Sequence, residues 1–382
     1  MADSASRLAG DILTGTVKLL DIPADMQAAA ELTYDDVGLW LGDHLDSDEQ
    51  WSFYPQGSMR LGTVVRPSEH DEYDIDAVAE CNIAKESTTQ AELKKCVGDA
   101  LKSYVKAKAG DDKAPTHCEE GKRCWTLEFR LPFHMDVLPA IPDPKAPPTG
   151  IQLTDRTYQR WLWSNPIAFA KWFHLKSRQS YELRVALAKS LQVNVEDVPE
   201  WHVKTTLQQA VQVLKVHRNI YFARDLDSRP PSVLLTTLAG HAYGGERPLF
   251  DAVMGIAADM HRYIERDGGD YVVLNPVQPS DRPENFADRW GKDPELVKKF
   301  FGWLSALVRS LDEAVGTKTG VQDMVQRLGA SFGMSPVQKA AQDYADRQTR
   351  NRTSNVLNVT STGAVTTGAG IASVRDHTFH GE

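Results

Sequence analysis

The segment Glu72–Glu80 (EYDIDAVAE) limits the fold of this chain more than any other stretch. Its apolar residues, Ile75 among them, alternate with acidic ones as in a strand that buries one face. Side chains at positions i and i+2 of a strand point to the same face, so Asp74 and Asp76 must project together. Two like charges side by side repel each other. Hard cations reverse this balance, because Mg²⁺ prefers carboxylate oxygens combined with substrate phosphates. For the pair alone, an exposed strand edge or turn is the alternative.

A third carboxylate lies in a second predicted strand, Phe133–Leu138 (FHMDVL). Asp136 stands between the apolar residues Met135 and Val137. An unpaired charge is costly to bury, so Asp136 should face a site. Three carboxylates on adjacent strands suit two-metal phosphoryl transfer, which activates the attacking hydroxyl and steadies the leaving pyrophosphate. We therefore predict that Asp74, Asp76 and Asp136 are catalytic and hold two Mg²⁺ ions, with Mn²⁺ as an alternative ion.

The predicted metal site is preceded by Gln56–Thr63 (QGSMRLGT). Gly57 allows the backbone to approach a triphosphate, and Ser58 offers a hydroxyl and an amide N–H as phosphate donors. A Gly-Ser pair alone is weak evidence. Followed by D-x-D on one strand and an aspartate on another, it indicates a nucleotide site.

The rest of the chain divides into a mixed half and a helical half. Apolar periodicity predicts a helical stretch over 5–48, broken near Pro23, and a lysine-bearing helix over 86–108. From Trp51 to Cys81 a loop or short helix should lead into the strand, and Cys124–Arg130 reads as another strand. Residues 139–148, with five prolines, read as an extended connection or turn. Further helices are predicted over 166–191, 202–222, 231–243, 248–267 and 294–315. The fold class is therefore α+β, a catalytic lobe followed by an α-helical lobe.

We predict four domains or segments. A helical N-terminal segment, 1–50, should pack across both lobes; 51–165 should form the catalytic core, 166–348 the helical lobe and 349–382 a flexible tail rich in Thr, Ser, Asn and Gly.

Composition limits the function classes. With a formal net charge of −9 and a pI of about 5.7, the chain lacks the basic excess typical of nucleic-acid binders and suits a small-molecule enzyme better. No stretch is long and apolar enough for a transmembrane helix, and the N-terminus does not read as a secretory signal, so we expect a cytoplasmic protein without a membrane partner. The four cysteines include no C-x-x-C pair and match no common zinc finger, which predicts reduced thiols.

The motifs GSMRLGT (57–63), DEYDIDAV (71–78) and FHMDVLPAI (133–141) resemble the Pol-β-like nucleotidyltransferase superfamily. More narrowly, the chain is similar to the bacterial cGAS/DncV-like nucleotidyltransferases of antiphage signalling (CBASS). Further segments extend the resemblance over about residues 50–310; they are VLKVHRN (213–219), SVLLTTLAGHAY (232–243) and NPVQPSDRPENFADRW (275–290).

The resemblance implies a bilobed molecule with its active site in the cleft. It implies that Gln56, Gly57 and Ser58 belong to a triphosphate-binding loop, which Arg60 helps to position. It also implies that Lys215 and Ser232 contact the donor triphosphate. From the residues alone, Lys215 is as readily a solvated lysine on an amphipathic helix, and Ser232 a helix N-cap.

The implied activity is the joining of ribonucleoside triphosphates, ATP or GTP or both, into a cyclic di- or trinucleotide or a linear oligonucleotide that serves as a second messenger. The alternatives are a transferase acting on an RNA end, one acting on a small molecule such as an aminoglycoside, and an inactive nucleotide-sensing module. The NFADRW segment favours messenger synthesis, and the three carboxylates disfavour an inactive module.

Two expectations concern partners. The C-terminal RDHTFHGE (375–382) is a candidate docking or conjugation peptide for an accessory regulatory protein, with a frayed end as the alternative. Because the zinc-ligand cluster of the animal DNA sensor is not visible, no DNA activator is expected.

Overall fold

A computed structural model gives the structure of the chain. It describes residues 2–45, 50–66, 73–131, 133–155, 161–177, 204–281, 283–316, 320–353, 358–359, 365–366 and 372–373. The chain forms two compact units, one of Leu20–Val308 and one of Met1–Leu19 with Arg309–Glu382. The larger unit contains every predicted site residue.

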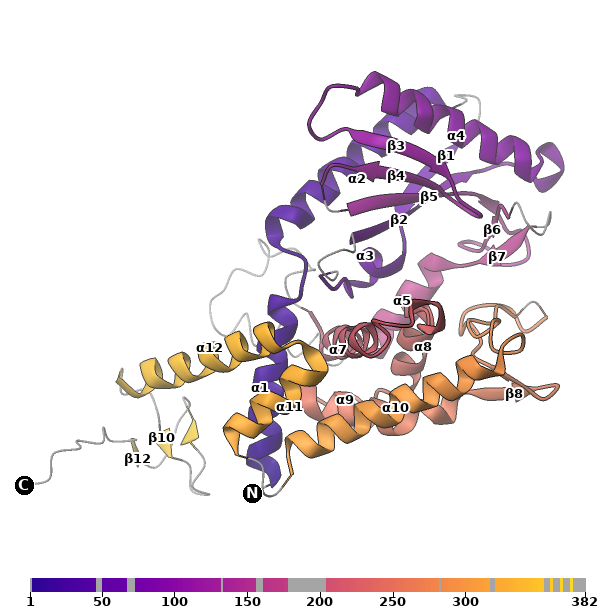
Figure 1. The fold of residues 1–382 in the computed structure, drawn as a ribbon. Coiled ribbons are helices and arrows are strands. Elements are labelled where there is room, and N and C mark those ends of the chain that lie inside the picture. Colours follow the sequence, from indigo (N-terminus) through magenta and orange to yellow (C-terminus); the bar gives the residue numbers. More distant parts are fainter. Residues whose placement is uncertain are drawn as a thin grey trace, which may run out of the picture. The chain divides into compact units, whose positions relative to one another are not determined.

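A mixed sheet forms the first part of the larger unit (Figure 1). Its central order is β1 (Trp51–Pro55), β2 (Tyr73–Cys81), β5 (Phe133–Pro142), β4 (Trp125–Phe129), β3 (Pro115–Glu120). β2 and β5 are parallel, and the other neighbours are antiparallel. Two short strands, β6 (Ile151–Leu153) and β7 (Leu162–Ser164), extend the sheet from the end of β5.

The sheet confirms the strands predicted around Asp74, Cys124 and Asp136, and it corrects two details. β1 was expected to be loop or short helix; its residues are nearly all half-buried, so the strand lacks a clear alternation. β5 continues through Pro139 to Pro142, because the proline-rich stretch is extended there and pairs with β6.

Two helices cover one face of the sheet. From α2 (Ala24–His44) come Val37 and Leu41, and α4 (Gln90–Ala107) contributes Val97 and Leu101. These side chains share a core with the inward residues of the strands, which include Ile75, Leu127, Phe133 and Met135. α4 begins later than predicted because Thr89 and Glu92 form a capping box there. The strand residues that alternate with this core are therefore left for the opposite face.

The helical part of the larger unit contains α5 (Pro166–Lys176), α7 (Thr206–Tyr221), α8 (Ser232–Ala242) and α9 (Leu249–Asp259). α10 (Pro294–Ala314) runs from this unit into the smaller one. The helix predicted over 248–267 is wrong in its last part: β8 (Glu265–Asp267) and β9 (Asp270–Val272) form a hairpin, with Gly268 and Gly269 at positive φ in its turn. Residues 178–191 and 202–203 of the predicted helices lie outside the described residues.

The smaller unit is built from α1 (Ala2–Leu19), α11 (Val321–Phe332) and α12 (Met334–Thr353). α1 and α12 pack so closely that a Cβ at Gly15 would lie 2.9 Å from that of Ala340. Past α12, the strands β10 (Asn358–Val359), β11 (Val365–Thr366) and β12 (Ala372–Ser373) pair antiparallel, a feature that the predicted tail 349–382 did not include. The candidate docking peptide 375–382 lies outside the described residues.

The four predicted segment boundaries remain predictions. Within the described part of the chain, no helix combines the length and the apolar character that a bilayer span requires. None of the four cysteines, all of them within the described residues, forms a disulfide.

Candidate active site

The three predicted aspartates meet on the two parallel strands at the centre of the sheet. In the register of β2 with β5, Asp76 is opposite Asp136 and Asp74 is opposite His134. Because side chains alternate along a strand, all four side chains lie on the face away from α2 and α4. The structure therefore brings the three predicted aspartates together and adds His134, which the sequence analysis did not single out.

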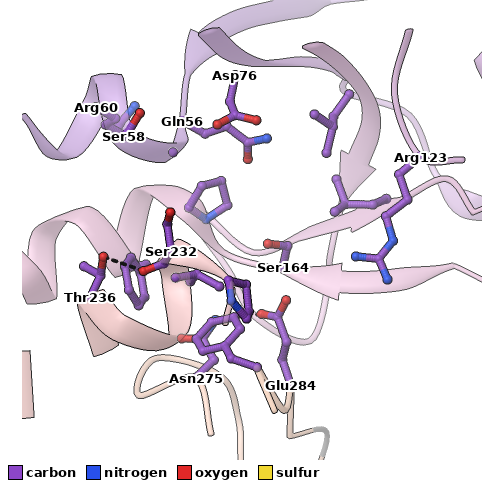
Figure 2. Close-up of a pocket in the computed structure, with 18 of the residues that line it drawn as sticks. Gln56, Ser58, Arg60, Asp76, Arg123, Ser164, Ser232, Thr236, Asn275 and Glu284 are labelled. Atoms are coloured by element: carbon purple, nitrogen blue, oxygen red, sulfur yellow. Dashed lines mark hydrogen bonds between the residues drawn. The ribbon is translucent and has the colours of Figure 1, made fainter. Parts of the chain in front are cut away.

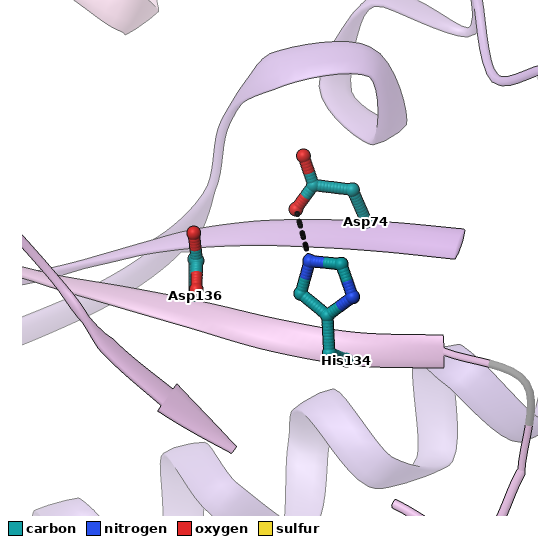
Figure 3. A group of neighbouring side chains, drawn as sticks. All are labelled: Asp74, His134 and Asp136. Carbon is teal, nitrogen blue, oxygen red and sulfur yellow. Dashed lines mark ion pairs between the residues drawn. The ribbon is translucent and has the colours of Figure 1, made fainter. Parts of the chain in front are cut away.

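Their polar atoms are close enough to share a cation. One ligand atom each from Asp74, His134 and Asp136 lie within 4.8 Å of one another, and Figure 3 shows these side chains rising from the two strands. His134 Nε2 lies 3.5 Å from Asp74 Oδ1.

Asp76 is the carboxylate of this group whose ionised form is disfavoured. Burial, followed by the nearby carboxylates of Asp74 and Asp136, raises its pKa. His134 and Lys215 act in the opposite direction without reversing the shift. The group thus carries more negative charge than the surrounding side chains balance, which is the environment that a divalent cation stabilises.

Asp136 is held from the neighbouring strand. Thr126 on β4 is its register partner, and Thr126 Oγ1 donates a hydrogen bond of 2.5 Å to Asp136 Oδ1. This bond orients the carboxylate.

The Gly-Ser loop comes directly against Asp76. Gln56 N–H donates to the Asp76 carbonyl at 2.8 Å, and Gly57 follows at φ 60°, where the short helix α3 (Gly57–Leu61) begins. A Cβ at Gly57 would lie 2.9 Å from Asp76 Cγ and closer still to Oδ2. Glycine is therefore required here both by the left-handed conformation and by the close approach. Arg60 Nη1 donates to the Pro55 carbonyl at 3.1 Å, as expected of a residue that positions the loop.

One face of α7 is hydrogen-bonded to the segment that follows this loop. Gln208 donates to the Leu61 carbonyl at 2.9 Å, Gln212 to that of Val64 at 2.5 Å, and Lys215 to that of Thr63 at 2.9 Å. Every residue of α7 from Thr206 to Arg218 is buried. The solvated-lysine reading of Lys215 is thus wrong: burial, with Arg218 nearby, lowers its pKa to about 7.

Ser232 lies at the start of α8, but it is not the N-cap. Pro231 occupies that position, and Ser232 Oγ instead accepts a hydrogen bond of 3.0 Å from Arg218 Nη1. Arg218 is buried, and burial followed by the charge of Arg229 lowers its pKa to about 9. Sequence reasoning missed Arg218, although it follows Lys215 by three positions on the same helix, a spacing that places both on one face.

These groups surround one cavity of 1590 Å³. In Figure 2, Gln56 and Asp76 lie on one side of it and Ser232, Asn275 and Glu284 on the facing side. The cavity exceeds the roughly 300–1,000 Å³ of sites for one small ligand. All predicted site residues except Asp136 line it; Asp136 is opposite Asp76 in the register of β2 with β5. Further lining residues that the sequence analysis did not single out are Arg123, Trp161, His134, Arg218, Glu284 and Phe286.

Comparisons with known proteins agree with this geometry. Residues 51–139 match the family model "Cyclic GMP-AMP synthase DncV-like, nucleotidyltransferase domain". The chain is 28% identical over 389 residues to a c-di-GMP synthase of Roseivirga ehrenbergii, covering 97% of this chain and 100% of that protein. It is 30% identical over 336 residues to the cyclic dinucleotide synthase CdnG of Bradyrhizobium diazoefficiens, covering 82% of this chain and 77% of that protein.

The solved structure of this CdnG in complex with GTP superimposes with a TM-score of 0.68 at 25% identity, covering 90% of this chain and 99% of that one. The likeness confirms the predicted fold class, a nucleotidyltransferase lobe of the Pol-β-like type with an α-helical lobe.

Proposed function

We propose a reaction for this chain on the premise that it belongs to the cGAS/DncV-like nucleotidyltransferase family, as its relatives establish. The two relatives described above are cyclic dinucleotide synthases. We propose that it joins two ribonucleoside triphosphates, at least one of them GTP, into a cyclic dinucleotide and releases pyrophosphate. The observation that carries this proposal is the set of three aspartates on paired central strands, with the Gly57 loop against one of them.

Magnesium fits this set of side chains. Asp74, Asp76 and Asp136 supply the oxygen ligands that Mg²⁺ prefers, and the carboxylates beside Asp76 raise its pKa more than the charges of His134 and Lys215 lower it. When bound, two such ions supply charge neutralisation at the reacting phosphate and lower the pKa of the attacking hydroxyl.

The side chains and backbone groups of the chain itself bind and orient the two nucleotides. A ribose hydroxyl of one nucleotide gives up its proton to solvent as its oxygen forms a bond to the α-phosphorus of the other. The bond from that phosphorus to the bridging oxygen breaks, and pyrophosphate leaves with the electron pair. Catalysis then depends on holding oxygen and phosphorus in line. Ser58 and the adjacent backbone N–H groups suit the β- and γ-phosphates, and the size of the cavity suits two nucleotides at once.

Positively charged side chains of the cavity suit the opposite side of the triphosphate. Arg218 and Arg229 line the cavity, and among the described residues Arg218 forms no ion pair with a carboxylate. Lys215 also lines the cavity, and its Nζ donates hydrogen bonds to the carbonyl and the hydroxyl of Thr63. We therefore assign Lys215 two roles: it holds the segment after the loop, and it faces the phosphates. Ring closure repeats the same step after the linear intermediate has turned over.

The biological role of the product is proposed from the family resemblance, not from the geometry of the site. We propose that the product is a second messenger of antiphage defence, and that an accessory protein engages the tail 349–382.

The test uses Mg²⁺, all four ribonucleoside triphosphates with one α-labelled, phosphatase treatment and separation of the products. A phosphatase-resistant cyclic dinucleotide supports the proposal, and the double variant Asp74→Ala, Asp76→Ala should not form it. Product from the double variant would refute the metal assignment, and formation of a chain on an added RNA end alone would refute the reaction.

A further inference from the structure

Glu284 is a carboxylate in a cavity that otherwise suits phosphates. It lines the cavity wall that faces the Gly57 loop, and Figure 2 shows its carboxylate directed into the pocket. A negative charge here repels a triphosphate, so it contributes nothing to phosphate binding. A different part of the substrate must account for it.

The backbone holds Glu284 in place. Asn275 N–H donates to the Glu284 carbonyl and Phe286 N–H to the Val273 carbonyl, both at 2.8 Å, and Leu274 and Asn285 form an isolated bridge between them. The two chain segments thus form a small, closed antiparallel pair. This pairing fixes the position of the Glu284 backbone, from which its side chain extends.

The carboxylate is also oriented, with acceptor capacity remaining. Asn275 is buried, its Oδ1 accepts from Val277 N–H at 3.1 Å, and its Nδ2 donates to Glu284 Oε2 at 2.8 Å. The Asn275 amide thus links the backbone of Val277 to the Glu284 carboxylate and orients it. Among the described residues, no Lys, Arg or His lies within ion-pair distance of Glu284. Burial raises its pKa, and the Asn275 bond and the charge of Arg123 limit that rise.

The same wall offers surfaces for a base. Trp161, Trp163 and Phe286 line the cavity near the chain segments that carry Ser164 and Glu284. Aromatic faces of this kind stack on any nucleobase, but they do not tell one base from another.

We propose that Glu284, positioned by Asn275, selects guanine in one nucleotide site of this cavity. An ionised carboxylate only accepts hydrogen bonds. Guanine presents two adjacent donors on one edge, the N1–H and the 2-amino group, which match the two carboxylate oxygens. Adenine presents an acceptor, N1, beside its 6-amino group, so the same carboxylate would face a lone pair. Cytosine has the same mismatch, and uracil has one N–H between two carbonyls.

This inference deepens the proposed function and rests on it. It makes Glu284 a specificity-determining residue and Asn275 a positioning residue. The chemistry predicts that inosine, which keeps N1–H but lacks the 2-amino group, binds between guanine and adenine.

The experiment measures binding rather than turnover. The full chain is titrated in a calorimeter with the α,β-methylene analogues of GTP, ITP and ATP, whose bridging carbon blocks pyrophosphate release. We expect the GTP analogue to bind at least about tenfold more tightly than the ATP analogue, since hydrogen bonds to a charged group are strong. Glu284→Gln should weaken the GTP analogue by at least about tenfold while leaving the ATP analogue unchanged or tighter.

Asp288→Asn is the matched control, because it removes one carboxylate from the same cavity lining. Because the charge of Asp288 raises the pKa of Glu284, its removal should not lower the ratio of the GTP to the ATP affinity. Three results overturn the inference: equal affinities in the natural chain, an unchanged ratio in Glu284→Gln, or an equal loss for both analogues, which would indicate ribose recognition. If the labelled-nucleotide assay gives a cyclic dinucleotide in any of these cases, the proposed function stands and the guanine assignment alone fails.

Discussion

Gly57→Ala tests whether the close approach of the loop to Asp76 is required for catalysis. The new Cβ would lie 2.9 Å from Asp76 Cγ and 3.2 Å from its Cβ, well inside the 3.5–4.0 Å of ordinary carbon contacts. Either Asp76 rotates away or the loop lifts from the strand. A displacement of about 1 Å at a reacting centre costs about 100-fold in rate. Backbone strain adds about 1–2 kcal/mol of lost stability, because alanine is disfavoured at φ 60°.

Gly268→Ala separates the two effects. Gly268 has φ 57°, yet a Cβ there meets no atom within 4 Å. Both variants should lose a similar free energy of unfolding in denaturant titrations, about 1–2 kcal/mol. Only Gly57→Ala should lower kcat for pyrophosphate release, by at least about 100-fold. If Gly57→Ala is destabilised like Gly268→Ala but keeps a kcat within about threefold of the natural chain, the reasoning from the close approach is refuted.

Two further substitutions test single contacts. Thr126→Val removes the hydroxyl that holds Asp136 and should lower kcat by about 10- to 100-fold, whereas Thr116→Val, which removes a hydroxyl from exposed β3, should not; equal kcat values in both variants would contradict a positioning role for Thr126. Burial lowers the pKa of His217 to about 4, so the unfolded chain binds more protons between about pH 4 and 6.5 and stability falls as the pH falls through this window. His217→Phe should therefore reduce the loss of unfolding free energy between pH 7 and pH 5 by about 2 kcal/mol, with the exposed His261→Phe as control; parallel pH profiles for His217→Phe and the natural chain would rule this out.

The acidic strand shows how far the sequence alone could go. The alternation around Asp74 fixed both the strand and the face of its carboxylates, because this information is local. That Asp76 is opposite Asp136 depends on the parallel pairing of β2 with β5, which no local pattern contains. His134 could have been found, since it lies two residues before Asp136 and so on the same face.

The helical part shows where hydropathy fails. Residues 206–218 of α7 are all buried. Its buried Gln208, Gln212, Lys215 and Arg218 donate hydrogen bonds to main-chain carbonyls of other segments. A pattern of polar and apolar residues cannot distinguish such a face from a solvated one. Glu284 was missed for a similar reason, because its position depends on the pairing of residues 273–275 with 284–286.

The bonds from α7 to residues 61–64 have an evolutionary consequence. Gln208, Gln212 and Lys215 each donate to a main-chain carbonyl, which any residue supplies, and only the added bond from Lys215 Nζ to Thr63 Oγ1 needs a particular side chain among the described contacts. Substitutions at Leu61 and Val64 can therefore accumulate without breaking the connection, while Gln208 and Gln212 cannot drift freely. Among homologues, we expect constraint on the donor side and at Thr63, with no correlated changes between the two glutamines and residues 61 and 64. A search for co-varying pairs would miss the connection that ties the loop to the helix.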